Sequence, residues 1–430
     1  MAASSSAIDF PPSQTAVRVR LVDTTAVMTV RAQSFVKPVQ PGHELLNLTC
    51  AAFLIDHEPS GKRVMFDLGV RKDFWNYAAV LQKRIGSIIP SLRVDRDVPE
   101  ILAEKGVALD SISSVVWSHY HWDHIGDMSL FPSSTEVVVG PGFKSSPLLL
   151  PGYPNKQDSP VRSSDFQGRE LREIDFAKSG LQIGGYGAFD FFGDGSFYLL
   201  GALGFISLLT ICRLDVGEPI LELTATTDTP GHCVGHMCGL ARTTAGTDST
   251  FLLLGGDICH FAGDLRPNPT HPIPDPVPAT VLDRELREQY PSPCPCSLFT
   301  DHHPAISQGL ESGDPRQTPW YKVSTHPSSA YVDPRTSQES VDKLISFEQS
   351  PAVMICLSHD QALLTFLPTL NKDPGADLNE WKSKGWKEKC RWDWLNELPR
   401  GNGRYGRRPI VEGFWRDGKP WDRSNMTGEE

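Results

Sequence analysis

The chain has 430 residues, a formal net charge of −11 at pH 7 and 22% charged residues, a globular composition with enough length for one elaborated domain or two. This acidic balance provides no basic surface for phosphates, so nucleic acid is not an expected partner and a nuclease is disfavoured. No apolar run reaches the length of a membrane span, residues 1–12 lack the pattern of a secretory leader, and the nine cysteines form no regular framework. We therefore expect a cytoplasmic protein with reduced thiols and no membrane partner.

Apolar patterning predicts strands and short helices along most of the chain. The expected strands are, in chain order, residues 17–30 (a strand and its neighbour), 50–56, 63–68, 112–117, 136–140, 189–200, 237–241, 251–255 and 352–357. The expected helices are residues 98–105, residues 279–289 and a helix opened by the capping box Thr336-Ser-Gln-Glu339. The first of the strands indicate the beginning of a β-sheet.

Three further segments have distinctive compositions. Residues 141–164 are rich in Pro, Gly and Ser, and we expect a long loop at the rim of a substrate site. Residues 263–331 are rich in Pro and irregular apart from the helix at 279–289, and we expect them to form a lid on a catalytic domain that spans residues 16–372. Residues 373–430 carry six tryptophans, which predicts an extension that packs on the body of the protein.

The predicted strand 112–117 leads directly into a run of metal-ligand residue types. His119, His121, Asp123 and His124 follow one another within six residues. In extended backbone, residues i and i+2 point to the same side, so His119 and His121 reach one ion, and neutral imidazole suits zinc or iron. Asp123 and His124 are adjacent and diverge, which makes them poor further ligands for that ion but a natural start for a second. The spacing therefore predicts two metals.

A two-metal site needs further ligands from elsewhere in the chain. Three candidates stand at turns or strand ends. His232 follows the Thr-Pro-Gly turn at 229–231, Asp257 follows the apolar strand 251–255, and His359 follows the apolar strand 352–357. Loops at strand ends are common places for functional side chains.

The order of these motifs, from Asp67-Leu-Gly69 through the histidine run to His359, resembles that of the metallo-β-lactamase superfamily. The resemblance covers Asp67 to Asp360 and implies a four-layered αββα sandwich, an α/β fold with the site at one edge of its two sheets. It also implies the metal ligands: His119, His121 and His232 for the first ion, Asp123, His124 and His359 for the second, and Asp257 as the bridge between them.

The resemblance further implies the chemistry. A hydroxide between the two ions would attack a carbonyl carbon, because two cations lower the pKa of water toward neutrality and polarise the carbonyl. Asp123 would also orient this nucleophile and transfer a proton. Two Zn²⁺ ions are the default cofactors, although manganese or iron would satisfy the same ligands.

Several branches of this superfamily can be compared. A flavo-diiron protein needs a flavodoxin module, and a processing nuclease needs a basic surface. The sequence shows neither feature, so neither branch is expected. The chain is similar to the lactonase-like branch, which includes fungal proteins, and we expect it to open a small lactone or lactam in detoxification or secondary metabolism. An acyl thioesterase remains an alternative, and so does a noncatalytic metal-binding protein, which would be expected to have lost ligands. The expected partner is a small acyl substrate, and no oligomeric state is predicted.

His260 occupies a position at which quorum-signal lactonases of this branch have a tyrosine, three residues after the bridging Asp257. An imidazole could donate the same hydrogen bond to the substrate carbonyl or to the leaving group. The alternative is that His260 packs beside the metal ligands without touching substrate.

Residues 201–227 form an insertion between the strand that ends near Leu200 and the turn before His232. Two interpretations are open. The insertion is an additional apolar hairpin that lines the pocket, or it is foreign to the fold and comes from an intron that the predicted coding sequence retains.

Overall fold

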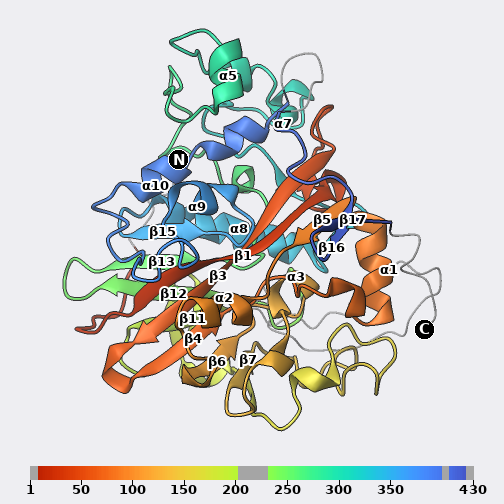
Figure 1. Ribbon diagram of the computed structural model, residues 1–430. Helices are drawn as coiled ribbons and strands as arrows, with labels where there is room; N and C mark the ends of the chain where they lie inside the picture. The colour runs from red at the N-terminus through yellow and green to blue at the C-terminus, as the bar shows by residue number, and fades with distance from the viewer. Residues whose placement is uncertain (1–7, 202–230, 400–405, 423–430) are drawn as a thin grey trace.

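Two β-sheets packed face to face form the centre of the protein (Figure 1). The computed structural model describes residues 8–201, 231–399 and 406–422. The larger sheet has the strand order β17 (Lys419–Trp421), β16 (Phe414–Arg416), β5 (Ser91–Val94), β1 (Arg18–Arg31), β3 (Leu45–His57), β4 (Lys62–Phe66), β6 (Ile112–Val116), β7 (Glu136–Val139) and β8 (Leu171–Glu173). The smaller sheet has the order β15 (Val353–Cys356), β13 (Thr250–Leu254), β12 (Cys238–Thr244), β11 (Phe197–Gly201), β10 (Tyr186–Asp190) and β9 (Leu181–Ile183).

Helices and a small ribbon complete the described structure. The helices are α1 (Ala79–Ile88), α2 (Val98–Glu104), α3 (Trp122–Ile125), α4 (Phe176–Ser179), α5 (Arg284–Gln289), α6 (Ser297–Thr300), α7 (Pro304–Ser307), α8 (Pro334–Gln349), α9 (Gln361–Phe366) and α10 (Trp386–Cys390). Strands β2 (Val36–Lys37) and β14 (Lys322–Val323) pair as a separate two-stranded sheet.

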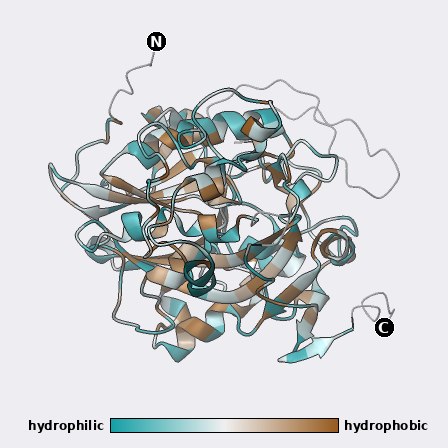
Figure 2. Cartoon of the chain, turned by 90° about the horizontal axis from the view of Figure 1, so that it is seen from above, coloured by the Kyte–Doolittle hydropathy of each residue, from teal (hydrophilic) through white to brown (hydrophobic). Residues whose placement is uncertain are grey.

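Alternation of side chains along the strands creates three apolar layers. Phe66 and Val116 of the larger sheet and Leu252 and Leu254 of the smaller sheet belong to one core between the sheets. The opposite side chains face the helices: one layer joins Met65 and Val115 to Ile101 of α2, and another joins Leu253 to Leu344 of α8. Figure 2 shows the chain coloured by hydropathy. The architecture is therefore the αββα sandwich that the sequence predicted.

The strand register places the ends of several strands at one edge of the sandwich. Strands β4, β6 and β7 pair in parallel in the larger sheet, and β13 pairs in parallel with β15 in the smaller sheet. The carboxyl ends of parallel neighbours lie at the same sheet edge. Asp67 follows β4, His119 follows β6, and Asp257 and His359 follow β13 and β15, so these separate segments meet.

Residues 17–30 differ from the prediction of a strand and its neighbour. They form the single strand β1, which pairs with β3 along its length, and the register shifts between Asp23 and Val27. Thr25 adopts φ 60° at this irregularity. A bulge of this kind keeps a long strand continuous while it bends, and the change in alternation resembles a strand boundary in the sequence.

Several helices begin where an aspartate caps them. Helix α5 starts after Asp283, whose side chain accepts a hydrogen bond from the backbone of Leu286, so it is shorter than the predicted 279–289. Helix α8 starts at Pro334 because Asp333 caps it, and the predicted capping residue Thr336 lies inside its first turn. Asp360 caps α9 in the same way.

The Pro-rich segment 263–331 and the C-terminal extension pack into one apolar cluster with β1 and α1. Ile273 and Trp320 of the first segment share this cluster with Trp394 of the extension. Helices α5 and α7 of the Pro-rich segment lie at the top of Figure 1. Strands β16 and β17 of the extension join the edge of the larger sheet through β5.

One sequence-based prediction concerns residues at and beyond a limit of the described structure. The insertion predicted at 201–227 lies, after Gly201, outside the described residues. Within the described ranges, no helix combines the length and the apolar character needed to cross a membrane.

Candidate metal centre

Asp123, His124, Asp257 and His359 offer four ligand atoms that all lie within 4.8 Å of one another. The Nε2 atoms of His124 and His359 lie 2.9 and 3.0 Å from Asp257 Oδ1. His359 Nε2 lies 3.5 Å from Asp123 Oδ2. The four residues come from the turn after β6 and from the ends of β13 and β15, and each is at most 8% exposed.

The two imidazoles of this group are each held in place through Nδ1. His124 Nδ1 lies 2.8 Å from Asp67 Oδ2, and His359 Nδ1 donates to the backbone oxygen of Thr49 at 2.8 Å. Their Nε2 atoms and Asp257 Oδ1 are buried and form no hydrogen bond. Buried polar atoms rarely lack a partner, whereas metal-binding imidazoles are typically anchored through the other ring nitrogen. The three converging atoms therefore fit a divalent cation.

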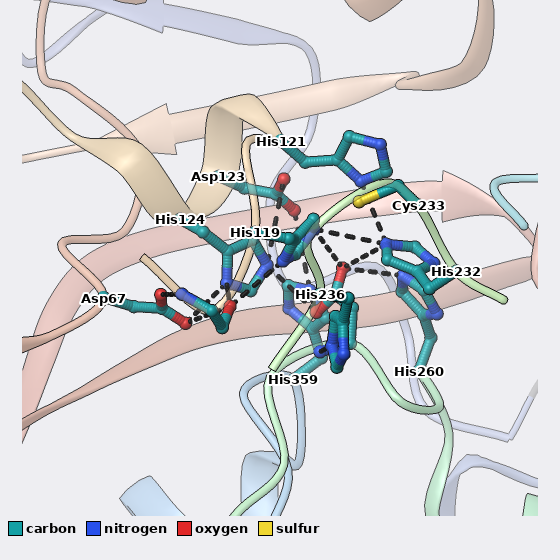
Figure 3. Close-up of polar contacts among 12 residues, drawn as sticks. Asp67, His119, His121, Asp123, His124, His232, Cys233, His236, His260 and His359 are labelled. Carbon is teal, nitrogen blue, oxygen red and sulfur yellow. Dashed lines mark hydrogen bonds and ion pairs between the residues drawn. The ribbon is translucent and has the colours of Figure 1, made fainter. Parts of the chain in front are cut away.

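A second group of potential ligands lies beside the first. His119, His121, His232 and Cys233 place their ligand atoms within 4.8 Å of one another. His232 Nε2 lies 3.2 Å from His119 Nε2 and 3.0 Å from His121 Nδ1. Figure 3 shows the three rings close together with the Cys233 sulfur beside them. Three imidazoles and one thiol are donors that zinc accepts readily.

Asp257 lies between the two groups. Its Oδ1 faces His124 and His359, while its Oδ2 lies 3.5 Å from the Nε2 atoms of both His119 and His232. The carboxylate is 1% exposed. One oxygen toward each group is the arrangement that a carboxylate bridge between two cations requires.

Asp67 supports the centre from behind the ligands. Its carboxylate accepts hydrogen bonds from the backbone N–H and the hydroxyl of Ser118, at 2.7 and 2.8 Å, in addition to its contact with His124. In Figure 3 it lies beside His124, on the side away from His232. Asp67 adopts φ 61°, a left-handed conformation that aspartate and asparagine tolerate better than most residues.

Gly126 closes the turn that carries the histidine motif against the Asp67 loop. Its backbone N–H donates to the oxygen of Gly69 at 3.0 Å, and its φ is 52°. A Cβ at this position would lie 2.5 Å from the Cβ of Leu68. Only glycine allows the two loops to approach this closely.

Burial and charge affect the two groups differently. Burial lowers the pKa of His119 and His121 well below the usual range and lowers that of His232 to about 4. Burial also acts against protonation of His124 and His359, but neighbouring groups, foremost the Asp257 carboxylate, outweigh it and raise both pKa values well above 6.5. Burial opposes ionisation of Asp257, yet the surrounding histidines hold its pKa well below 3.8. Around an ionised Asp257, protonation is therefore favoured at His124 and His359, whereas His119, His121 and His232 are held neutral, the form in which imidazole binds a metal.

His260 contacts the bridging carboxylate and a buried phenol. Its Nε2 lies 2.9 Å from Asp257 Oδ2, and its Nδ1 lies 2.9 Å from the hydroxyl of Tyr331. His236 takes a different position and belongs to neither group: its Nε2 accepts a hydrogen bond from the backbone N–H of Asp257 at 3.0 Å.

A mainly apolar cavity opens beside the two groups. His121, Asp123, Asp257 and His260 form part of its wall, and Leu148 and Pro160 of the 141–164 loop also line it. The empty space in and in front of it is about 730 Å³, which includes open solvent at its mouth. The loop predicted at a substrate rim therefore does lie beside the metal-ligand side chains.

All the predicted ligands and His260 thus come together in one place, while two residues of the centre were not predicted. Tyr331 follows an irregular segment, and Arg84 stands in α1 as one arginine among many. Nothing in the sequence around either residue indicates that its side chain lies at this site. Cys233 was not among the predicted ligands, yet its thiol lies among the imidazoles of one group.

The metallo-beta-lactamase superfamily profile matches residues 47–315. Among characterised relatives, the chain is 38% identical over 395 residues to the gamma-lactamase FDB1 of Fusarium pseudograminearum, covering 90% of this chain and 84% of the relative. It is 40% identical over 283 residues to the gamma-lactamase MBL2 of Gibberella moniliformis, covering 66% of this chain and 100% of the relative. It is also 34% identical to the metallo-hydrolase mfmC of Annulohypoxylon moriforme, and the match covers 91% of this chain and 90% of the relative.

Solved structures with a similar course of the chain include an AiiA variant of B. thuringiensis with N-decanoyl-L-homoserine bound at the active site. The match covers 83% of this chain and 98% of that one, with 15% identity and a TM-score of 0.46.

Proposed function

The chain belongs to the metallo-beta-lactamase superfamily and is a hydrolase, and from that premise we propose that it opens a small cyclic amide or ester at a centre of two metal ions. The names of the two gamma-lactamase relatives favour the cyclic amide. The expected products are a carboxylate and an amine or, from a lactone, an alcohol.

The position of Asp257 carries the proposal of two ions. Its two oxygens face different histidine groups, and both groups have ligand atoms within 4.8 Å of one another. We assign His119, His121 and His232 to one ion, and Asp123, His124 and His359 to the other, with Asp257 as the bridge. When bound, two such ions acidify a water molecule and polarise the substrate carbonyl.

We propose zinc for both positions. Imidazole and carboxylate ligands also suit manganese and iron, but the thiol of Cys233 beside His119, His121 and His232 favours a softer ion. Elemental analysis of the purified protein tests this assignment.

Asp123 and His260 are the proposed proton-handling and substrate-contacting residues. Both line the cavity on which the ligands converge. Asp123 orients the attacking water and accepts its proton, since one of its oxygens faces His359 while the residue borders the cavity. His260 supports the carbonyl oxygen or protonates the leaving group. Tyr331 holds the imidazole of His260 through its Nδ1.

The cavity supports a compact and largely apolar substrate. Val30, Phe35 and Leu48 of the β1–β3 region line it together with Leu81 of α1. Such walls stabilise a ring or a short acyl body by burying its surface.

The test is a panel of lactams, lactones and thioesters assayed with the zinc-loaded protein and with its Asp257→Ala variant. We expect the best turnover with a lactam, and a loss of at least 100-fold in the variant, because removal of the bridge disturbs both ions. Equal turnover of the best substrate by the two proteins would contradict the two-ion proposal. Turnover confined to thioesters would contradict the proposed substrate.

A further inference from the structure

Helix α1 forms one wall of the cavity with a regular pattern. Val80, Arg84 and Ile88 all line the cavity, and residues four apart lie on one face of a helix. Arg84 therefore stands between two apolar side chains, one turn before it and one turn after it. Leu81 and Ile89 extend the same apolar surface.

The Arg84 guanidinium has no anionic partner in the described parts of the chain, where its side chain forms no ion pair or hydrogen bond. Asp158 also lines the cavity, but its carboxylate is paired with Lys156 at 2.9 Å. The residue is half-buried, and a guanidinium against apolar surface is costly unless a counter-ion meets it.

Arg84 also lies close enough to the metal-ligand side chains to influence them. After burial and the charge of His232, the Arg84 charge is the next contribution that lowers the pKa of His121. The cavity wall therefore carries two kinds of polar group: the metal-ligand residues with His260, and Arg84 of α1. Apolar side chains, Leu81 and Leu148 among them, line the same cavity.

We propose that Arg84 binds an anionic group of the substrate, so that the preferred substrate is a lactam or lactone whose apolar body carries a carboxylate away from the reacting carbonyl. This inference rests on the proposed function and names its substrate class. The planar guanidinium forms paired hydrogen bonds with a carboxylate, which an ammonium ion does not reproduce. Contact of Arg84 with the carboxylate, in addition to the contacts at the metal centre, holds the carbonyl beside the metal-ligand residues.

The experiment compares two substrates that differ only in this group: a γ-lactam with a carboxylate substituent and its neutral carboxamide twin. With the zinc-loaded protein, kcat/KM is measured for both, and the ratio of the two values is the preference for the anion. A hydrogen bond to a charged group is worth about 1.5–3 kcal/mol, which corresponds to about 10- to 100-fold. We expect the preference to fall by this factor in Arg84→Met, mainly through KM, and to fall partly in Arg84→Lys.

Lys83 offers the matched control. It is the neighbouring cation on α1, it is exposed, and it does not line the cavity. We expect Lys83→Met to retain the full preference, which separates binding by Arg84 from a general effect of positive charge on α1. Methionine keeps the helix propensity and the apolar contacts of the arginine stem, and circular dichroism verifies the fold of each variant.

Two results would overturn the inference. The first is the same kcat/KM of the wild-type protein for the carboxylate compound and its twin. The second is an equal reduction of both values in Arg84→Met, which is expected if Arg84 binds only the carboxylate that the reaction forms. If neither γ-lactam is hydrolysed and the panel described above also contains no lactam or lactone that is a substrate, the proposed function fails, but calorimetry still decides the inference. Tighter binding of the carboxylate compound than of its twin, lost in Arg84→Met, supports it, and equal binding contradicts it.

Discussion

The hydroxyl of Tyr331 lies 2.9 Å from Nδ1 of His260, whose other ring nitrogen lies 2.9 Å from Asp257. The Pro-rich segment thus ends in a phenol that fixes the orientation of an imidazole at the cavity wall. Tyr331 is 3% exposed, so the contact is shielded from solvent.

Tyr331→Phe should lower kcat by about 10-fold, the usual range for the loss of one hydrogen bond that orients a catalytic group. KM and bound metal should change little, because Tyr331 touches none of the proposed ligands except by ring contact with His232. Initial-rate assays measure kcat and KM, and elemental analysis measures the bound metal. Loss of metal from Tyr331→Phe would show instead that the phenol maintains the ligand arrangement.

Asp67→Asn should weaken metal binding by about 10- to 100-fold, the range found when a residue that anchors a ligand is replaced. The amide cannot provide the two acceptor oxygens that Ser118 and His124 use. Asparagine tolerates the left-handed backbone of Asp67, so the fold should persist. Competition with a chelator measures the affinity. An unchanged affinity would mean that Asp67 serves only the backbone turn.

Asp165 should make stability depend on pH. Burial, followed by the charge of Asp127, raises its pKa from 3.8 to about 7. Between these values the unfolded chain has lost a proton that the folded chain retains, so stability falls as pH rises from about 4 to 7 and the penalty reaches about 4 kcal/mol above pH 7.

The Asp165→Asn variant cannot ionise at this position, and asparagine can still accept the hydrogen bond from the backbone of Arg162. Thermal unfolding at several pH values should therefore show a smaller decrease between pH 4 and 7 in the variant than in the wild type. Parallel curves for the two proteins would contradict the assignment of this pH dependence to Asp165.

Arg266→Met should destabilise the protein by about 3–5 kcal/mol, the cost of removing the closest partner of a buried charge. Arg266 contacts both oxygens of Glu348, at 3.1 and 3.2 Å, and the two side chains are 3% and 0% exposed. Chemical denaturation measures the effect. The double variant with Glu348→Leu should recover much of the loss, and a double variant as unstable as Arg266→Met would contradict an electrostatic cause.

The fold was predictable from the sequence wherever side-chain alternation or a short apolar run was bounded by turn residues. The hairpin of β3 and β4 and the strands β6, β7, β13 and β15 are examples. The structure of β1 was not predictable in detail, because a bulge changes the alternation without ending the strand. Strands β16 and β17 were missed, since three residues each are too few for a periodic pattern.

The candidate ligands could be found because their residue types are chemically distinctive and follow apolar strands. His232, Asp257 and His359 illustrate this. Arg84 and Tyr331 could not be found in the same way, because their roles depend on which distant segments they face. An arginine in a helix and a tyrosine after a Pro-rich segment are ordinary in sequence, and only the packing of α1 and residues 263–331 around the cavity gives them their place.

The most direct test of the central claim is the number of zinc ions per chain in the wild-type protein and in Asp257→Ala, measured together with lactam hydrolysis. A centre bridged by Asp257 predicts two ions in the wild type, fewer than two in the variant, and a parallel loss of hydrolysis. Two ions and full hydrolysis in Asp257→Ala, or a single ion in the fully active wild type, would contradict it.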